Sequence, residues 1–331
     1  MSKQQKQGYW RIVARQFLRN RFAVAAFLLL LLLAALALAA PFLAGNIPMY
    51  MVKDGKSYLL PNLFTYSDLV SFRFDTWKPG PNDSAIRPPI PYPPDESDLD
   101  GALARPGAEH WLGTDDRGRD VLSRLIWGTR ISMTIGFVAV GISVVIGVIL
   151  GALAGFYGGR IDMVILRMIE VMLCFPTLIL ILALVAVLPP SIYNIMLALG
   201  LTRWPDVARL VRAEFFKLRE SDFCIAARAT GLSDLRIIFR HLLPNAMAPV
   251  WVNSTFGVAG AILIESALSF LGFGAPPPTA SWGEILNQSK NYVDFAWWLV
   301  TFPGLAIFIT VTAFNLVGEG LRDAMDPRLR Q

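Results

Sequence analysis

Long apolar runs without any charged residue limit most strongly what this chain can fold into. Phe22 to Ala44 and Ile131 to Tyr157 are two such runs. Each exceeds the roughly 20 residues that a helix needs to cross the hydrocarbon core of a bilayer. Of the 331 residues, 54% are hydrophobic and only 17% are charged. A soluble domain of this length buries less apolar surface, so the sequence predicts a multi-pass membrane protein.

A third uncharged stretch, from Val171 through Thr202, is too long for a single span. Pro189-Pro190 inside it marks a natural break, because proline cannot donate the helical hydrogen bond. The helix after this break begins at about Ser191 and has Arg203 and Asp206 in its second half. This stretch therefore predicts spans three and four.

Two further runs complete the predicted set of spans. Pro249 to Gly274 carries one charge, Glu265, and Phe295 to Gly318 carries none. The sequence therefore predicts an all-α membrane protein with six transmembrane helices.

Lysines and arginines decide the predicted orientation, because cytoplasmic loops carry the positive excess. They cluster near both ends of the chain, at Lys3, Lys6, Arg11, Arg15, Arg19, Arg21, Arg322, Arg328 and Arg330. Both termini are therefore predicted to be cytoplasmic. Residues 45–130, with 10 basic and 12 acidic residues, are predicted to lie outside. Because the excess of 30 Lys and Arg over 25 Asp and Glu follows this topology, no nucleic-acid partner is predicted.

The predicted organisation follows the spans. It comprises a cytoplasmic segment 1–21, a first transmembrane helix 22–44, an external segment 45–130, a five-helix core 131–318 with a cytoplasmic loop 213–245, and a cytoplasmic tail 319–331. The end of the first run, ALALAAPFLAG, also looks like a signal-peptide cleavage site. The run exceeds the usual length of a signal-peptide core, so an uncleaved anchor is predicted.

One cytoplasmic segment does not fit its apolar surroundings. AARATGLSDLRIIFRHLLPN, residues 226–245 and called here the basic segment, carries Arg228, Arg236 and Arg240 on one side. An apolar stripe that starts at the preceding residue occupies the other side and comprises Ile225, Ala226, Ala229, Leu232, Leu235, Phe239 and Leu242.

The turn residues of the basic segment predict two short helices. Gly231 can end the first helix, Ser233 can cap the second and Pro244 should stop it. The small Ala226 and Ala227 would let another protein approach, and the arginines can bond acidic groups on it. Amphipathicity alone fits a helix lying on anionic lipid equally well.

A resemblance separates these two alternatives. The cytoplasmic loop of ABC-importer permeases has the pattern Glu-Ala-Ala, three residues, Gly, nine residues, Ile, one residue, Leu-Pro. The matching residues at this spacing are Ala226, Ala227, Gly231, Leu243 and Pro244. Ile225 stands in place of the Glu and His241 in place of the Ile. The segment nevertheless resembles the version in the dipeptide, oligopeptide and nickel branch.

The resemblance implies what the basic segment does. In that family the loop is a coupling helix that docks into a groove of a separate ATPase subunit. The residues implied here are Ala226, Ala227, Arg228, Gly231, Ser233, Asp234, Arg236, Arg240, His241 and Pro244. The implied partners are a homologous B-type permease, two ATPase subunits that bind ATP and Mg, an extracytoplasmic solute-binding protein and the bilayer of the bacterial cytoplasmic membrane.

Four other motifs, spread between residues 110 and 330, resemble the C-type permease of peptide importers. They are HWLGTDDRGRDVLSRLIWGTRISM, GFYGGRIDMVILRMIEVMLCFPTLIL, LSFLGFGAPPPTASWGEIL and GEGLRDAMDPRLR. The external segment between about Ile47 and Glu109 is longer than in typical dipeptide permeases, and its stretches GKSYLLPNLF and RPPIPYPPDESD more nearly resemble oligopeptide and microcin-type permeases. Import of nickel is the alternative within this branch, and it is disfavoured because no His or Cys cluster lies in the spans.

The acidic stretch GTDDRGRD raises the question of chemistry. A membrane-bound metal-dependent hydrolase is one hypothesis for its three aspartates. The interleaved arginines favour instead an external gate or receptor-contact loop made of Asp115, Asp116, Arg117, Arg119 and Asp120. The sequence contains no Gly-rich phosphate-binding motif, and its two cysteines and two histidines have no metal-ligand spacing. Neither catalytic residues nor a cofactor or metal in this chain is therefore predicted.

Glu265 is the one acid well inside a predicted span. It can line the pore, bond to a neighbouring helix, or reach the nearby external surface; the sequence gives its depth but not its rotation. Arg167 and Glu170, one helical turn apart, are predicted to form a structural pair.

Residues 47–109 contain at least nine prolines, so a long helix is not expected there. Their large apolar side chains predict a small packed cap, and these are Tyr50, Tyr58, Leu59, Leu60, Leu63, Phe64, Tyr66, Phe72, Phe74 and Trp77. The Pro-rich run RPPIPYPPDESD is predicted to form an extended strap that leads to His110.

Overall fold

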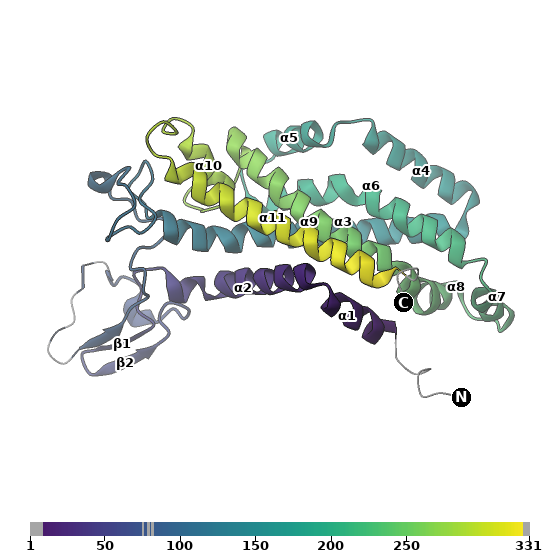
Figure 1. Cartoon of the computed structure of the whole chain (residues 1–331), viewed down its shortest axis with the longest axis horizontal. Helices are drawn as coiled ribbons and strands as arrows, with labels where there is room; N and C mark the ends of the chain where they lie inside the picture. Colours follow the sequence, from purple (N-terminus) through teal and green to yellow (C-terminus); the bar gives the residue numbers. More distant parts are fainter. Residues whose placement is uncertain (1–8, 75, 78–79, 81–82, 327–331) are drawn as a thin grey trace. The chain divides into compact units, whose positions relative to one another are not determined.

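The structure is a computed structural model that describes residues 9–74, 76–77, 80 and 83–326 (Figure 1). The predictions that involve Lys3, Lys6, Pro79, Pro81, Arg328 and Arg330 lie outside these residues. The chain divides into two compact units. Unit 1 comprises Met1–Leu30, Thr134–Glu265 and Ile309–Gln331, and unit 2 comprises Leu31–Met133 and Ser266–Phe308.

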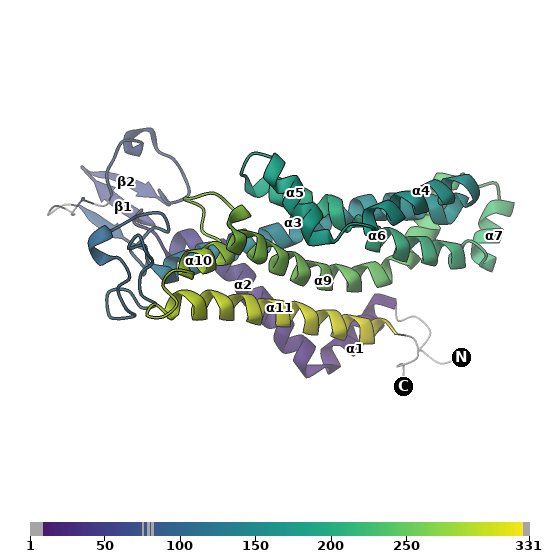
Figure 2. The same ribbon diagram turned by 90° about the horizontal axis from the view of Figure 1, so that it is seen from above.

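Helices make up most of the described chain (Figures 1 and 2). The α-helices are α1 (Tyr9–Arg19), α2 (Arg21–Leu43), α3 (Val121–Tyr157), α4 (Gly159–Leu173), α5 (Thr177–Val187), α6 (Ile192–Leu218), α7 (Asp222–Ala229), α8 (Asp234–Ile237), α9 (Leu243–Leu268), α10 (Trp282–Ser289) and α11 (Trp298–Met325). Two π-helical turns, η4 (Ile238–Leu242) and η5 (Ser269–Phe273), flank α9.

Four helical stretches in the described residues are long and apolar enough to cross a membrane, and they confirm the multi-pass character of the chain. They are Arg21–Leu43, Val121–Tyr157, Asp234–Phe273 and Trp298–Met325, and they overlap with predicted spans one, two, five and six. A fifth is counted if α4 and α5 form one bent span. The count of six, which also requires α6, stays a prediction.

The predicted third span differs from the structure in one respect. The break at Pro189-Pro190 is confirmed, because α5 ends at Val187 and α6 begins at Ile192. A second break, not predicted, separates α4 from α5 with a bend of 84°. Pro176 explains it, since its ring cannot continue the helix and biases the preceding Phe175 away from helical geometry.

In unit 1, α6 lies against α3, α4 and α5. Gly147, Gly151 and Gly155 of α3 form a stripe every four residues along the contact with α6. A Cβ at each of the three would lie 2.5 Å from an atom of α6. These glycines therefore let the two helices approach closely, as small residues do in membrane helix pairs.

The prediction of an all-α fold is wrong for the external segment, because unit 2 contains a three-stranded antiparallel sheet. Strands β1 (Tyr50–Lys53), β2 (Lys56–Leu59) and β3 (Ser84–Ile86) pair in the order β2-β1-β3. Asp54 and Gly55 join β1 to β2 with φ of +51° and +74°. Two residues with positive φ make the tight turn that Asp-Gly favours in hairpins, so the sequence VKDGKSY held the missed signal.

The aromatic residues of the external segment pack together, as predicted for a cap. Met51, Tyr58 and Leu69 are buried. Partly buried Tyr66, Phe72, Phe74 and Trp77 surround them. Because these side chains remove apolar surface from water, the sheet has a hydrophobic core of its own.

Candidate functional site

The bend predicted at Gly231 is confirmed and has a specific local cause. Gly231 has φ +75°, which glycine adopts without strain. Its N–H donates to Arg228 O at 2.9 Å, and Leu232 N–H donates to Ala227 O at 3.3 Å. This pair of bonds is the Schellman arrangement that ends a helix, so α7 stops here and α8 starts in a new direction.

Two other predictions for the basic segment need correction. Ser233 occupies the position before α8, but its side chain makes no capping hydrogen bond. The helix does not stop at Pro244; it runs on from Asp234 to Phe273. The π-turn before the proline explains this, because Leu243 N–H donates to Ile238 O, five residues back. The wider turn accommodates Pro244, whose nitrogen carries no hydrogen and cannot donate the usual helical hydrogen bond.

The basic segment is anchored on one side to the core of unit 1. Cys224, Ala227, Ile237, Ile238 and Leu242 are buried in a cluster with side chains of α3, α6 and α9. Since these side chains interdigitate with three long helices, α7 and α8 are held as a firm extension of the bundle.

The other side of this segment leaves large apolar side chains open. Ile225, Leu235 and Phe239 are 55%, 65% and 63% exposed. They belong to the predicted apolar stripe, of which Leu242 alone is buried. Exposed apolar groups beside arginines are typical of a surface that another protein covers.

The predicted coupling residues mostly lie on this open surface. Ala227 is buried and His241 is half-buried, whereas the remaining eight are exposed, namely Ala226, Arg228, Gly231, Ser233, Asp234, Arg236, Arg240 and Pro244. The Arg228 guanidinium carbon lies 5.2 Å from the ring centroid of Phe156, which orients this side chain.

In unit 2, the acidic stretch forms a buried charge network. The Asp115 carboxylate accepts hydrogen bonds from Arg117 N at 2.9 Å, from Arg119 N at 3.0 Å and from Arg119 Nε at 2.8 Å. Asp120 Oδ1 accepts from Ser123 N at 2.7 Å and so caps the start of α3, while its Oδ2 lies 2.9 Å from His110 Nδ1.

Arg124 extends this network to two distant segments. Its Nε lies 3.4 Å from Asp115 Oδ2, its Nη1 donates to Pro94 O at 3.3 Å, and its Nη2 donates to Glu284 Oε2 in α10. Arg124 is fully buried. Burial raises the pKa of Glu284, and the adjacent guanidinium opposes that rise. Neither residue was predicted as part of a site, because the two are 160 positions apart and no local sequence pattern connects them.

The structure therefore restricts which predicted gate residues another protein can touch. Asp115, Arg119 and Asp120 are buried, Asp116 is half-buried, and Arg117 is exposed. Within the described chain, no group of three or more His, Cys, Asp and Glu side chains is arranged to hold a metal ion. The buried acids instead fix the loop against α3 and α10.

Gly118 closes this loop and provides a test of its packing. It has φ +72°, and a Cβ there would lie 1.6 Å from Asp98 O. Gly118→Ala should therefore lower the free energy of unfolding by more than about 1 kcal/mol, measured as a fall in the thermal midpoint in detergent. Gly107→Ala is the matched control, because its nearest atom would be 3.7 Å away. Equal midpoints for the two variants would contradict this packing.

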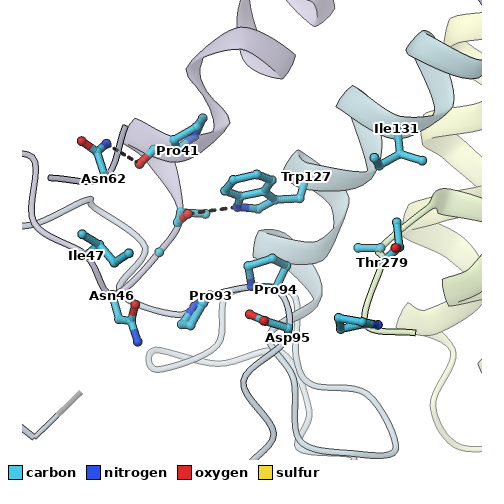
Figure 3. Close-up of a pocket in the computed structure, with 14 residues that line it drawn as sticks. Pro41, Asn46, Ile47, Asn62, Pro93, Pro94, Asp95, Trp127, Ile131 and Thr279 are labelled. Atoms are coloured by element: carbon cyan, nitrogen blue, oxygen red, sulfur yellow. Dashed lines mark hydrogen bonds between the residues drawn. The ribbon is translucent and has the colours of Figure 1, made fainter. Parts of the chain in front are cut away.

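Unit 2 also contains a cavity of about 550 Å³ beside the Pro-rich strap (Figure 3). Pro93, Pro94 and Asp95 of the strap lie on one side, and Trp127 of α3 lies on another. Trp127 Nε1 donates to Ala44 O at 3.0 Å. The strap is also pinned to the end of α2, because Ile90 N donates to Leu43 O and Gly45 N donates to Ile90 O. The predicted strap, which belongs to unit 2, is therefore held at Ile90 against the end of α2.

Glu265 is fully buried in α9. Its carboxylate therefore does not lie on the surface of this chain, while the choice between pore and packing roles stays a prediction. The predicted structural pair on α4 is confirmed, with Arg167 Nη1 donating to Glu170 Oε2 at 2.6 Å.

Comparisons with known proteins match this architecture. Residues 147–331 match the family described as "Binding-protein-dependent transport system inner membrane component". The chain belongs to this family. Residues 8–61 of the permease also match the "N-terminal TM domain of oligopeptide transport permease C". The resemblance to C-type permeases of ABC importers is thereby confirmed.

Several relatives of this permease are similar over most of its length. It is 45% identical over 235 residues to the dipeptide transport system permease protein DppC of Alkalihalophilus pseudofirmus, covering 71% of this chain and 77% of that one. It is 44% identical over 246 residues to the di/tripeptide transport system permease protein DppC of Pseudomonas aeruginosa, covering 72% of this chain and 81% of that one. The glutathione transport system permease protein GsiD of Pectobacterium atrosepticum is 36% identical over 321 residues, and the alignment covers 97% of this chain and 92% of that one.

Among solved structures, an inward-facing MetNI methionine ABC transporter aligns with a TM-score of 0.50 at 18% identity. The alignment covers 61% of the permease and 97% of that chain. At this identity the likeness shows the fold alone.

Proposed function

We propose that this permease is the transmembrane subunit of an ATP-driven importer for di- or oligopeptides, forming the translocation path with a homologous second permease. The observation that carries this proposal is the 44–45% identity to dipeptide and di/tripeptide permeases over about 70% of the chain. The sequence has no phosphate-binding motif of its own, so ATP and Mg would be bound by separate ATPase subunits.

The open face of the basic segment is the proposed contact with an ATPase subunit. Its apolar anchors Ile225, Leu235 and Phe239 lie among arginines that suit an acidic rim. Because the opposite face is packed into α3, α6 and α9, a displacement of α7 and α8 would move those helices as well. Closure of an ATPase pair could thus be passed to the spans as a rigid-body movement.

The proposed topology keeps six spans with both termini in the cytoplasm of a bacterial cell. In this arrangement α4 and α5 form one bent span, and α6 forms the next despite its charges. Residues 45–130 would then face an extracytoplasmic solute-binding protein. The extension of the GsiD alignment over 97% of the chain supports the presence of a segment of this size in a related permease.

Assembly is the first test of this function. The permease, tagged and co-expressed with the second permease and ATPase subunits of its gene neighbourhood, should retain all of them through purification in detergent. Recovery of the permease alone, from membranes in which the other subunits are present, would contradict the proposal.

The small sheet gives a separate prediction about the receptor. Ala44 and Ile90 are bridged and Met49 N donates to Ile86 O, so the two ends of residues 48–87 lie close together within unit 2. Replacing residues 48–87 by Gly-Gly-Ser should leave ATPase recovery unchanged, because the basic segment is untouched. ATP hydrolysis stimulated by the solute-binding protein should fall by about tenfold, as expected when a main contact is lost. Full stimulation of the shortened variant would show that the sheet does not contact the receptor.

A further inference from the structure

A cavity of about 320 Å³ lies in unit 1 where α4 breaks from α5. Met172 and Leu173 line it from the end of α4, Thr177 and Leu180 from the start of α5, and Gly260 from α9. α6 closes the remaining side. The volume is at the small end of ligand pockets, which are about 300–1,000 Å³.

Arg203 of α6 places a positive charge in this otherwise largely apolar cavity. Within the described residues, its guanidinium makes one hydrogen bond, from Nη1 to Gly257 O at 3.5 Å. Since an arginine carries five N–H donors, most of its capacity is available to a ligand. A Cβ at position 260 would lie 2.6 Å from Nη1, so Gly260 makes the room for the guanidinium. A charge in an apolar helical region is costly to keep and marks a functional site.

Two more features of the cavity bear on the ligand. Pro176 precedes α5 and provides no side-chain cap, and Thr177 is the first residue of that helix. The first N–H groups of α5 therefore have no hydrogen-bond partners within the helix. They add positive electrostatic potential to the part of the cavity that lies next to the break between α4 and α5. Asp206 lines the cavity too, and its carboxylate accepts from Arg209 Nη2 at 2.9 Å.

We propose that this cavity binds the terminal carboxylate of a transported peptide at Arg203, with Asp206 within reach of an ammonium group. Broken helices in transporters commonly direct an N-terminus at an anionic group of the substrate. The site combines one cation, one carboxylate and apolar walls, and this matches the two oppositely charged termini of a short zwitterionic peptide. The proposal rests on the proposed peptide-import function and assigns a substrate-contacting residue to it.

The test uses the assembled transporter in proteoliposomes, with trialanine and trialanine amide as probes. Arg203→Gln should reduce trialanine uptake by about tenfold, which is the effect of losing one charge-assisted contact. Arg203→Lys should retain part of the trialanine uptake that Arg203→Gln loses. Uptake of the amide should be unchanged, and so should ATP hydrolysis without peptide. Arg167→Gln is the matched control, because it removes an exposed arginine elsewhere in unit 1.

For each probe, uptake by the variant is compared with uptake of the same probe by the wild type. This comparison is needed because the receptor selects peptides before the permease does. If the receptor rejects the amide, equilibrium binding of both probes to the receptor-free complex makes the same comparison. Equal losses for trialanine and its amide would show a structural role for Arg203 and overturn the proposal. A wild-type complex that takes up neither probe would instead count against peptide import itself.

A lipid phosphate is the other source of the same anionic chemistry. Repeating the uptake assay in vesicles of phosphatidylcholine alone and with about one third phosphatidylglycerol separates the two. The proposal expects the Arg203→Gln defect in both. A defect that occurs only with phosphatidylglycerol, and equally for both probes, would assign the cavity to lipid.

Discussion

Replacing Arg124 by methionine is expected to lower the free energy of unfolding by about 3–5 kcal/mol, the usual cost of removing one member of a buried ion pair. The side chain is fully buried, donates hydrogen bonds to Glu284 and to Pro94 O, and forms an ion pair with Asp115 at 3.4 Å. Methionine fills much of the volume but leaves the carbonyl and the carboxylates without this donor. The thermal midpoint in detergent should fall well below that of the wild type.

The double variant Arg124→Met with Glu284→Met separates charge from packing. Because the second change removes the carboxylate left without its cation, the double variant should be more stable than Arg124→Met alone. Arg117→Met is the matched control, since Arg117 is exposed and its main-chain N–H, not its side chain, bonds to Asp115. A double variant that is less stable than Arg124→Met would contradict the ion-pair account.

Gly231→Asp is expected to reduce recovery of the ATPase subunits with the permease by about tenfold or more, because an unpaired charge enters a surface that must lose water. Nothing lies within 4 Å of a Cβ at this position, so the new side chain meets no neighbouring atom of the chain, and the cost inside the chain is confined to the backbone at φ +75°. Insertion in the membrane should therefore persist. The measurement is the amount of ATPase that co-purifies with the tagged permease, together with peptide uptake.

Gly231→Asn is the control that isolates the charge. Asparagine has nearly the same shape and also tolerates positive φ, so it imposes a similar backbone cost without the negative charge. Its ATPase recovery should lie close to that of the wild type. If the two variants lose ATPase equally, the backbone at the bend is responsible; if neither loses it, the proposed contact surface is wrong.

The membrane helices could be predicted because their signal is contained in single runs of sequence. The run around Phe22–Ala44 becomes α2, and the run Ile131–Tyr157 becomes most of α3. The bend at Gly231 was likewise local, since only glycine readily takes φ +75° there. Helix ends near proline were less predictable. Pro176 ended a helix and Pro244 did not, because a π-turn in the backbone before Pro244 accommodates it.

The candidate sites depended on contacts that no local pattern contains. Arg124 and Glu284 are 160 positions apart, and their pairing follows from how the acidic loop and α10 pack within unit 2. The cavity at Arg203 likewise required the unpredicted break between α4 and α5. The Asp-Gly hairpin is different, because its signal was local and was missed beside the many prolines of the segment.

Uptake of a radiolabelled dipeptide by proteoliposomes tests the central claim most directly. The vesicles contain the permease, the second permease and the ATPase subunits, with the solute-binding protein added outside and ATP enclosed. The account predicts accumulation that requires ATP and the receptor, and that is lost with Gly231→Asp but kept with Gly231→Asn. Accumulation that proceeds without ATP, or that is the same for Gly231→Asp as for the wild type, would contradict it.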